Sequence, residues 1–176
     1  IDMNKLDALV PTVAKVAQTQ PGAIIMVTAG KASTAFIREY LKTGERPQFF
    51  GVSVLSAKAL FADLGADAHG IVIAQVVPSP LRASYPISKE FIIAAKKANS
   101  KDTTYNSLEG YITAKVFIEA VRRAGKDLSR EKLISALETM NNYDLGGFVV
   151  DYSGGKRFGS TFVDLSIISK SGQFLH

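Results

Sequence analysis

The chain has 176 residues and a formal net charge of +5, with 47% hydrophobic and 21% charged residues. This composition is typical of a folded globular protein and argues against a disordered tail. The absence of cysteine excludes a disulfide framework, a zinc finger and a thiolate nucleophile. Lysine and arginine occur singly or in pairs, without the aromatic-interleaved stripe of a nucleic-acid-binding surface, so no nucleic-acid partner is predicted.

Metal and membrane functions have little support in the sequence. The chain holds two histidines, His69 and His176, and no metal-ligand spacing involves either of them. We therefore predict no metal site, and a Ser-His-Asp triad would have to use His69 alone. No apolar run reaches the length of about eighteen residues that spans a bilayer, and the first residues lack a signal-peptide pattern.

The first half of the chain alternates between helix and strand patterns. Apolar residues recur at helical spacing over residues 4–18, where Pro11 predicts a kink or a late start. Residues 23–27 form a continuous apolar run, which predicts a strand buried on both faces, as in a parallel sheet. The same alternation predicts a helix after Gly30, a strand at 49–52, a short helix ending at Leu64 and a strand at 71–77. These βαβ units predict right-handed crossovers and a sheet with helices on both faces.

Beyond Pro78 the pattern changes to helices followed by short strands. The predicted elements are helices at 88–99, 106–123 and 129–140 and strands at 148–152 and 161–169. The second of these helices is predicted to begin with a capping box, with Asn106 as N-cap and Glu109 three residues later. We expect an α/β fold in which a three-layer parallel sheet flanked by helices is joined to a partial second lobe.

Two turns that follow the predicted strands contain small and hydroxyl-bearing residues. Thr28-Ala29-Gly30 follows the first strand and Ser53-Val54 follows the second. A helix N-terminus at the carboxyl edge of such a sheet can bind a small carboxylate, and ligands of open α/β sheets lie at that edge. Thr28 and Ser53 are predicted either to contact a ligand or to cap their helices, whereas Ser56 is predicted to be a cap. With the single glycine Gly30, the first turn departs from a nucleotide-binding P-loop.

Residues for acid–base catalysis are hard to place. The carboxylates that we considered are better explained as helix-end residues that favour the helix dipole: Asp63, Asp67, Glu109 and Glu131. Lys31 is the only ionisable side chain close in sequence to Thr28 and Ser53. We therefore predict no catalytic residue, and a small α/β enzyme with its site at the same sheet edge remains an alternative.

Several short segments, in their order and spacing, resemble a known family. They are LEGYITAKV at 108–116, EAVRRAGK at 119–126, SRE at 129–131, LISALE at 133–138, DLGG at 144–147 and SGQF at 171–174. In this order the sequence resembles the branched-chain-amino-acid-type solute receptors of ABC importers, which have the type I periplasmic-binding fold. The resemblance covers nearly the whole chain.

The resemblance implies a particular domain organisation. Receptors of this family have two lobes joined by three crossings, and the chain is similar to their latter part, roughly half. Residues 1–77 would form the βαβαβ core of the C-terminal lobe, residues 78–147 would return to the N-terminal lobe, and residues 148–176 would complete the crossings. A Ser/Thr-rich loop that grips the ligand carboxylate, and a signal peptide, would belong to a missing N-terminal part.

The resemblance also implies a function and a binding site. The protein would capture an amino acid or another small carboxylate by closing its lobes, and deliver it to an ABC permease in the inner membrane without a cofactor. It would act in the periplasm or as a lipid-anchored extracellular receptor. Ligand contacts would be Thr28, Ala29, Gly30, Ser53 and Val54, with Gln75 near a crossing. Relatives often carry an acidic residue in the second turn for the ligand's ammonium group, and its absence here favours a plain carboxylate. A sensor domain on the same fold is the nearest alternative.

Overall fold

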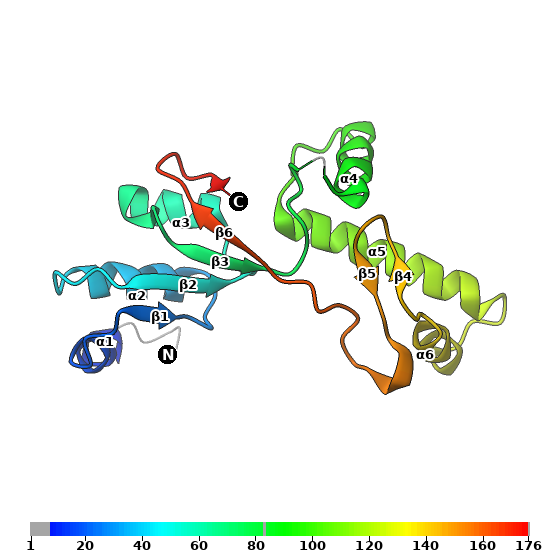
Figure 1. The fold of residues 1–176 in the computed structure, drawn as a ribbon, viewed down its shortest axis with the longest axis horizontal. Coiled ribbons are helices and arrows are strands. Elements are labelled where there is room, and N and C mark those ends of the chain that lie inside the picture. Colours follow the sequence, from blue (N-terminus) through cyan, green and yellow to red (C-terminus); the bar gives the residue numbers. More distant parts are fainter. Residues whose placement is uncertain (1–7, 83, 176) are drawn as a thin grey trace. The chain divides into compact units, whose positions relative to one another are not determined.

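The computed structural model describes residues 8–82 and 84–175, which form two compact units (Figure 1). Unit 1 contains the residues up to Gln75 and those from Leu165 onward, and unit 2 contains Val76–Asp164. The predicted helical residues 4–7 and His176 lie outside the described residues. The boundaries between the lobe segments, at 77/78 and 147/148, remain predictions.

Unit 1 is built from alternating helices and strands, followed by the last strands of the chain. Its elements are α1 (Leu9–Ala17), β1 (Ala23–Ile25), α2 (Lys31–Leu41), β2 (Gln48–Val52), α3 (Ala57–Leu64), η2 (Gly65–Ala68), β3 (Val72–Gln75), β6 (Asp164–Ile168) and β7 (Phe174–Leu175). The late start predicted for the first helix is confirmed, because α1 begins at Leu9 and Pro11 lies in its first turn, where no helical N–H bond is lost.

The strands form one mixed sheet in the order β1-β2-β3-β6-β7. The first three are parallel, and β7 runs antiparallel to β6. Where β6 joins β3, the Gly70 N–H donates to the Ile168 carbonyl and the Ile168 N–H donates to the Ile71 carbonyl, both at 2.9 Å. With Gly70 at a φ of 87°, this is a glycine β-bulge between antiparallel strands, a backbone that other residues rarely adopt.

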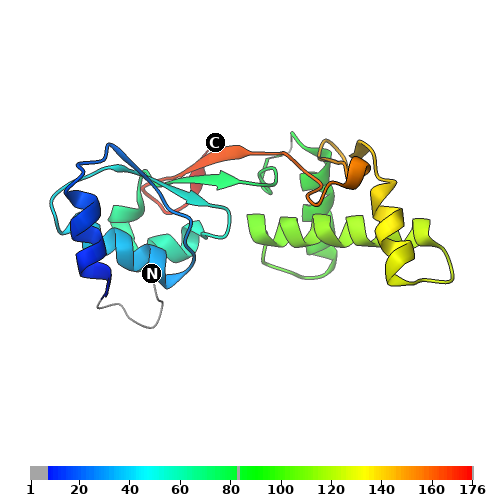
Figure 2. The same ribbon diagram turned by 90° about the horizontal axis from the view of Figure 1, so that it is seen from below.

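The core of unit 1 lies between one face of the sheet and three helices. Phe49, Ile73 and Ile168 point into it from the strands, and the ring of Tyr40 on α2 meets Phe49 edge-on at a centroid distance of 5.8 Å. Figure 2 shows α1, α2 and α3 on the same side of the sheet. Because β1, β2 and β3 follow one another in one direction across the sheet, right-handed crossovers place both connecting helices on one face.

The opposite face of this sheet, which we call the open face, is apolar and uncovered by any helix of the described residues. It is formed by the outward side chains Ile25, Phe50, Val52, Val72, Ala74 and Ile167. The prediction that the first strand is buried on both faces is therefore wrong for the described residues, since the Ile25 side chain is 77% exposed and Val27 is 82% exposed. Within the described part of the chain, β1 is an edge strand with helices on one side only.

Unit 2 is mostly helical. Its elements are α4 (Pro86–Lys97), α5 (Tyr105–Ala124), α6 (Arg130–Glu138), β4 (Tyr143–Asp144), β5 (Val149–Val150) and η3 (Ser153–Gly155). The two short strands pair with each other in antiparallel fashion. The α/β fold with a sheet flanked by helices is confirmed, although in the described residues the helices cover one face and not both. The last two predicted strands are shorter than expected.

The start of α5 differs from the prediction. Thr104, not Asn106, is the N-cap, and its hydroxyl accepts from the Ser107 N–H while the Ser107 hydroxyl accepts from the Thr104 N–H. Serine serves here in the reciprocal role that glutamate has in the usual capping box. The earlier start brings Tyr105 into the buried part of unit 2.

Candidate ligand-binding site

The predicted contact residues lie at one edge of the sheet of unit 1. Thr28, Ala29 and Gly30 follow β1, Ser53 and Val54 follow β2, and Gln75 ends β3. These three strands are parallel neighbours, so their carboxyl ends meet at the same edge. This edge is where open α/β sheets bind their ligands.

The turn after β1 leads directly into the N-terminus of α2. Gly30 is the N-cap and adopts φ 57° and ψ −140°, a conformation that favours glycine. The hydroxyls of Thr28 and Ser33 are 2.7 Å apart and share a hydrogen bond. Ala29 and Gly30 are exposed and Thr28 is half-buried. The turn therefore presents backbone and one hydroxyl to solvent, beside the positive end of the helix dipole.

The turn after β2 leads into α3. The Leu55 N–H closes it by donating to the Val52 carbonyl at 3.0 Å, and Val54 is 56% exposed. The Ser53 hydroxyl has no hydrogen-bond partner among the described residues. Ser56 is the N-cap of α3 and accepts from the Ala59 N–H at 3.4 Å, which confirms its predicted role as a cap.

Gln75 lies inside unit 1, in contrast to the two exposed turns. Its side chain is 1% exposed, and its amide nitrogen donates to the Ser166 hydroxyl at 2.8 Å. The Gln75 amide oxygen Oε1 is buried and has no hydrogen-bond partner within the described part of the chain. Its amide nitrogen therefore holds β6, whereas the amide oxygen is the polar atom that remains without a protein partner in the described residues.

The charge along this edge is positive. Residues 26–34, 52–57 and 74–79, which form the carboxyl ends of the strands and the turns after them, contain no aspartate or glutamate and one lysine, Lys31. A carboxylate group placed here would meet hydroxyls, helix N-termini and a lysine. A ligand ammonium would find no carboxylate from these three segments.

Two of the remaining candidates for chemistry, His69 and Glu131, have structural partners. His69 lies near the opposite end of β3, where its Nδ1 is 3.0 Å from the Ile168 carbonyl. Glu131 lies in the first turn of α6, and hydrogen bonds from the backbone and from Ser129 lower the pKa of its carboxyl. Over residues 8–82 and 84–175, no group of three histidine or acidic side chains is placed to bind a metal ion.

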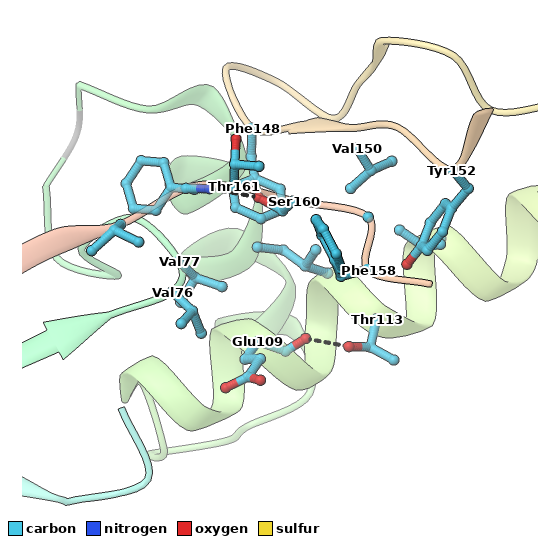
Figure 3. A pocket seen from close by; sticks show the side chains of 15 residues that line it. Val76, Val77, Glu109, Thr113, Phe148, Val150, Tyr152, Phe158, Ser160 and Thr161 are labelled. Atoms are coloured by element: carbon cyan, nitrogen blue, oxygen red, sulfur yellow. Dashed lines mark hydrogen bonds between the residues drawn. The ribbon is translucent and has the colours of Figure 1, made fainter. Parts of the chain in front are cut away.

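Unit 2 contains a separate apolar groove with a cavity volume of about 360 Å³. Figure 3 shows Phe148, Val150, Tyr152 and Phe158 on one side of it, and Glu109 and Thr113 of α5 on the other. The Phe148 and Phe162 rings pack at 5.8 Å between centroids. Such a lining would suit an apolar ligand or partner surface, because Glu109 is its one acidic or basic side chain.

This groove could not be predicted from the sequence. It forms where α5 meets the segment 158–163, which follows it by more than thirty residues, so no local motif marks it. The apolar positions Ile112 and Val116 at helical spacing, and the aromatic residues Phe158 and Phe162, are the signals that the sequence offers. None of the helices in the described ranges is long and apolar enough to cross a membrane.

The sequence pattern of the periplasmic binding protein family matches residues 4–162, most of the chain. The chain belongs to this family. The predicted resemblance to receptors of the leucine/isoleucine/valine-binding type is thus confirmed. Proteins of the family are ligand-binding and connected with transport, and they are periplasmic or extracellular.

Solved structures of periplasmic binding proteins agree with this assignment. An extracellular ligand-binding receptor from Verminephrobacter eiseniae is 28% identical, with a TM-score of 0.83 over 97% of this chain and 49% of that one. A substrate-binding periplasmic protein from Ralstonia solanacearum is 32% identical, with a TM-score of 0.81 over 94% and 48%. A possible leucine/isoleucine/valine-binding protein from Rhodopirellula baltica is 31% identical, with a TM-score of 0.80 over 90% and 44%.

The chain therefore spans about half the length of the solved structures that it matches. No curated protein matches it.

Proposed function

We propose that this chain is part of the solute-binding receptor of an ABC importer. This receptor captures a small carboxylate and presents it to a permease in the inner membrane. Family membership supports the general role. The ligand class is supported by one observation, the composition of the sheet edge in unit 1. There, exposed turns with hydroxyls and helix N-termini carry one lysine and no carboxylate.

The proposed contacts are Thr28, Ala29 and Gly30 in the first turn and Ser53 and Val54 in the second. A carboxylate at the start of α2 would accept hydrogen bonds from the Thr28 hydroxyl and from N–H groups of the first helical turn. The Ser53 hydroxyl, free of protein partners within the described residues, would add a donor from the neighbouring turn. Gln75 is the remaining proposed contact, and it would reach the ligand from its buried position at the end of β3.

The ligand preference follows from the missing acidic side chain. An α-amino acid would bring an ammonium group whose desolvation is costly without a carboxylate partner. A plain aliphatic or aromatic carboxylate carries no such cost. The proposed mechanism needs no cofactor and no catalytic residue, since recognition, and not bond cleavage, is the task of the site.

The test is a thermal-unfolding panel on the complete protein, with matched pairs of ligands that differ only by the α-amino group. At a ligand concentration of a hundred times Kd, a bound ligand stabilises the folded state by about 2.7 kcal/mol. We expect a rise in Tm of several degrees with one carboxylate class and a smaller rise with the matching amino acid. A rise with the amino acid alone would reject the ligand preference, and no rise with any compound would reject the receptor function.

A further inference from the structure

Gln75, at the end of β3, has a buried oxygen atom that lacks a donor. Its side chain is 1% exposed, and its amide oxygen Oε1 has no hydrogen-bond partner among the described residues. The other such atom in these residues is the Tyr40 hydroxyl, which lies in the last turn of α2, far from the ligand-binding edge. A buried acceptor without a donor bears its full desolvation cost, and native proteins leave few of them.

The neighbouring hydrogen bonds show which end of the Gln75 amide is free. The Ser166 hydroxyl donates to the Ile73 carbonyl at 3.4 Å, and it accepts from Gln75 Nε2 at 2.8 Å. Because a hydroxyl has a single hydrogen, Ser166 cannot also donate to the amide of Gln75. The unpartnered atom is therefore an acceptor, and a group that satisfies it must be a donor.

Gln75 lies in register with the two proposed contact turns. One row of paired residues crosses the three parallel strands: Ile25, Phe50 and Val72. Thr28, Ser53 and Gln75 each come three residues later in the chain, so they follow this row at the carboxyl edge of the sheet. Neighbouring strands lie about 4.8 Å apart, which separates Thr28 from Gln75, two strands away, by about 9.6 Å.

The surroundings of this row favour a ligand with an apolar middle and a neutral donor at its far end. Val54, next to Ser53, is 56% exposed and offers apolar surface between the two polar ends. An ammonium suits Gln75 less well than a hydroxyl, because a neutral amide does not offset the desolvation of a charge. Residues 26–34, 52–57 and 74–79 contain no carboxylate that could do so.

We propose that the ligand is an apolar carboxylate with a hydroxyl group at the end far from its carboxylate, and that Gln75 Oε1 accepts a hydrogen bond from this hydroxyl. The inference rests on the proposed binding function and adds the second polar group of the ligand. An α-hydroxyl lies next to its carboxylate and cannot reach across two strands. Gln75 then selects among carboxylates, because an acid without the hydroxyl leaves Oε1 buried and unpaired.

The experiment is isothermal titration of the complete protein with pairs of acids that differ only by a terminal hydroxyl. The pairs are 3-(4-hydroxyphenyl)propionate with 3-phenylpropionate, and 6-hydroxyhexanoate with hexanoate. We expect at least one hydroxylated acid to bind about 10- to 100-fold more tightly than its partner. In Gln75→Met, whose side chain has a similar length and no amide, we expect this preference to disappear. The control Ser56→Ala removes a helix cap at the same edge and should keep the preference.

The outcomes separate this inference from the proposed function. A preference for the hydroxylated acid that is lost in Gln75→Met supports the inference. Equal or tighter binding of the acid without the hydroxyl overturns it and leaves carboxylate binding intact. This comparison in the unmodified protein needs no variant, because a hydroxyl that finds no acceptor weakens binding.

Three further results also count against the inference. A preference that persists in Gln75→Met assigns the hydroxyl to another residue and overturns it. Tighter binding of 6-aminohexanoate than of 6-hydroxyhexanoate replaces the hydroxyl by an ammonium and overturns it as well. Absence of binding by both hydroxylated acids does the same, and if no compound of the thermal panel raises Tm, the proposed function fails too.

Discussion

The side-chain amide of Gln75 donates a hydrogen bond of 2.8 Å to the hydroxyl of Ser166, and both residues are 1% exposed. Gln75 is the last residue of unit 1 before the chain enters unit 2, and the chain re-enters unit 1 at Leu165, next to Ser166. This hydrogen bond therefore ties β3 to β6 at the place where both connections leave the sheet. The Ser166 hydroxyl also lies 3.4 Å from the Ile73 carbonyl.

This pair predicts an unequal response to two substitutions. Ser166→Ala leaves both polar atoms of the Gln75 amide buried without a partner, which costs about 1–3 kcal/mol of unfolding free energy. Gln75→Leu removes both of these atoms and leaves the Ser166 hydroxyl next to the Ile73 carbonyl, so we expect a loss of about 1 kcal/mol or less. Urea unfolding of the complete protein measures both, and a larger loss for Gln75→Leu would contradict this interpretation.

The proposed contacts predict a separation of affinity from stability. In Thr28→Val and Ser53→Ala, loss of a hydrogen bond to a charged carboxylate weakens ligand binding by about 10- to 100-fold, as expected for about 1.5–3 kcal/mol. The matched control is Ser56→Ala, which removes the cap of α3 and costs about 1 kcal/mol of stability without changing Kd. Isothermal titration and thermal unfolding together test this, and equal losses of affinity in all three variants would reject the assigned contacts.

Two glycines are expected to respond to alanine in opposite directions. Gly110 lies on the exposed side of α5 with open space around it, so Gly110→Ala raises the free energy of unfolding by about 0.5–1 kcal/mol.

Gly159 lies against the Tyr152 ring, and a methyl group there would overlap the ring. Gly159→Ala therefore forces the ring to move and lowers the unfolding free energy by about 1–3 kcal/mol. Both glycine variants are compared by chemical denaturation of the complete protein. A stabilised Gly159→Ala protein would show that Tyr152 does not pack on this glycine.

Asp151 predicts a defined acid dependence. Hydrogen bonds from Lys156, then from the Ser153 side chain and backbone, lower the pKa of its carboxyl from 3.8 to about 2. Because the pKa is lower in the folded state, the stabilisation is complete above pH 3.8 and is lost as the pH falls towards 2. Lys156→Met should shift the acid unfolding transition to higher pH, whereas Lys58→Met, with the same charge change on an exposed helix, should shift it less. Equal shifts would mean that net charge alone sets the transition.

The alternation of helices and strands could be predicted from the sequence because the spacing of apolar residues that marks each element involves only neighbours in the chain. The helix after Gly30, the end of the short helix at Leu64 and the start of a helix near Ser129 all depend on neighbours in the chain, and the structure agrees with them. The cap of α5 was misplaced because Thr104 and Asn106 both favour that role, and the packing of Tyr105 selects the earlier start.

The features that were missed depend on contacts between distant residues. The continuous apolar sequence of β1 predicts that both of its faces are buried. Residues 8–82 and 84–175 cover only one of these faces. The partner of Gln75 lies 91 residues away in the sequence, so its engagement inside unit 1 could not be predicted from the end of β3. The positions of Thr28 and Ser53 at one edge could be predicted, because parallel neighbouring strands bring their ends together.

The central proposal is that a carboxylate binds at the turns after β1 and β2. The most direct measurement is a crystal structure of the complete protein with the carboxylate that stabilises it most. We expect a carboxylate oxygen within about 2.7–3.2 Å of the Thr28 hydroxyl or of an N–H in the first turn of α2. A ligand bound in the groove of unit 2, or a carboxylate paired with groups away from Thr28 and Ser53, would contradict the proposal.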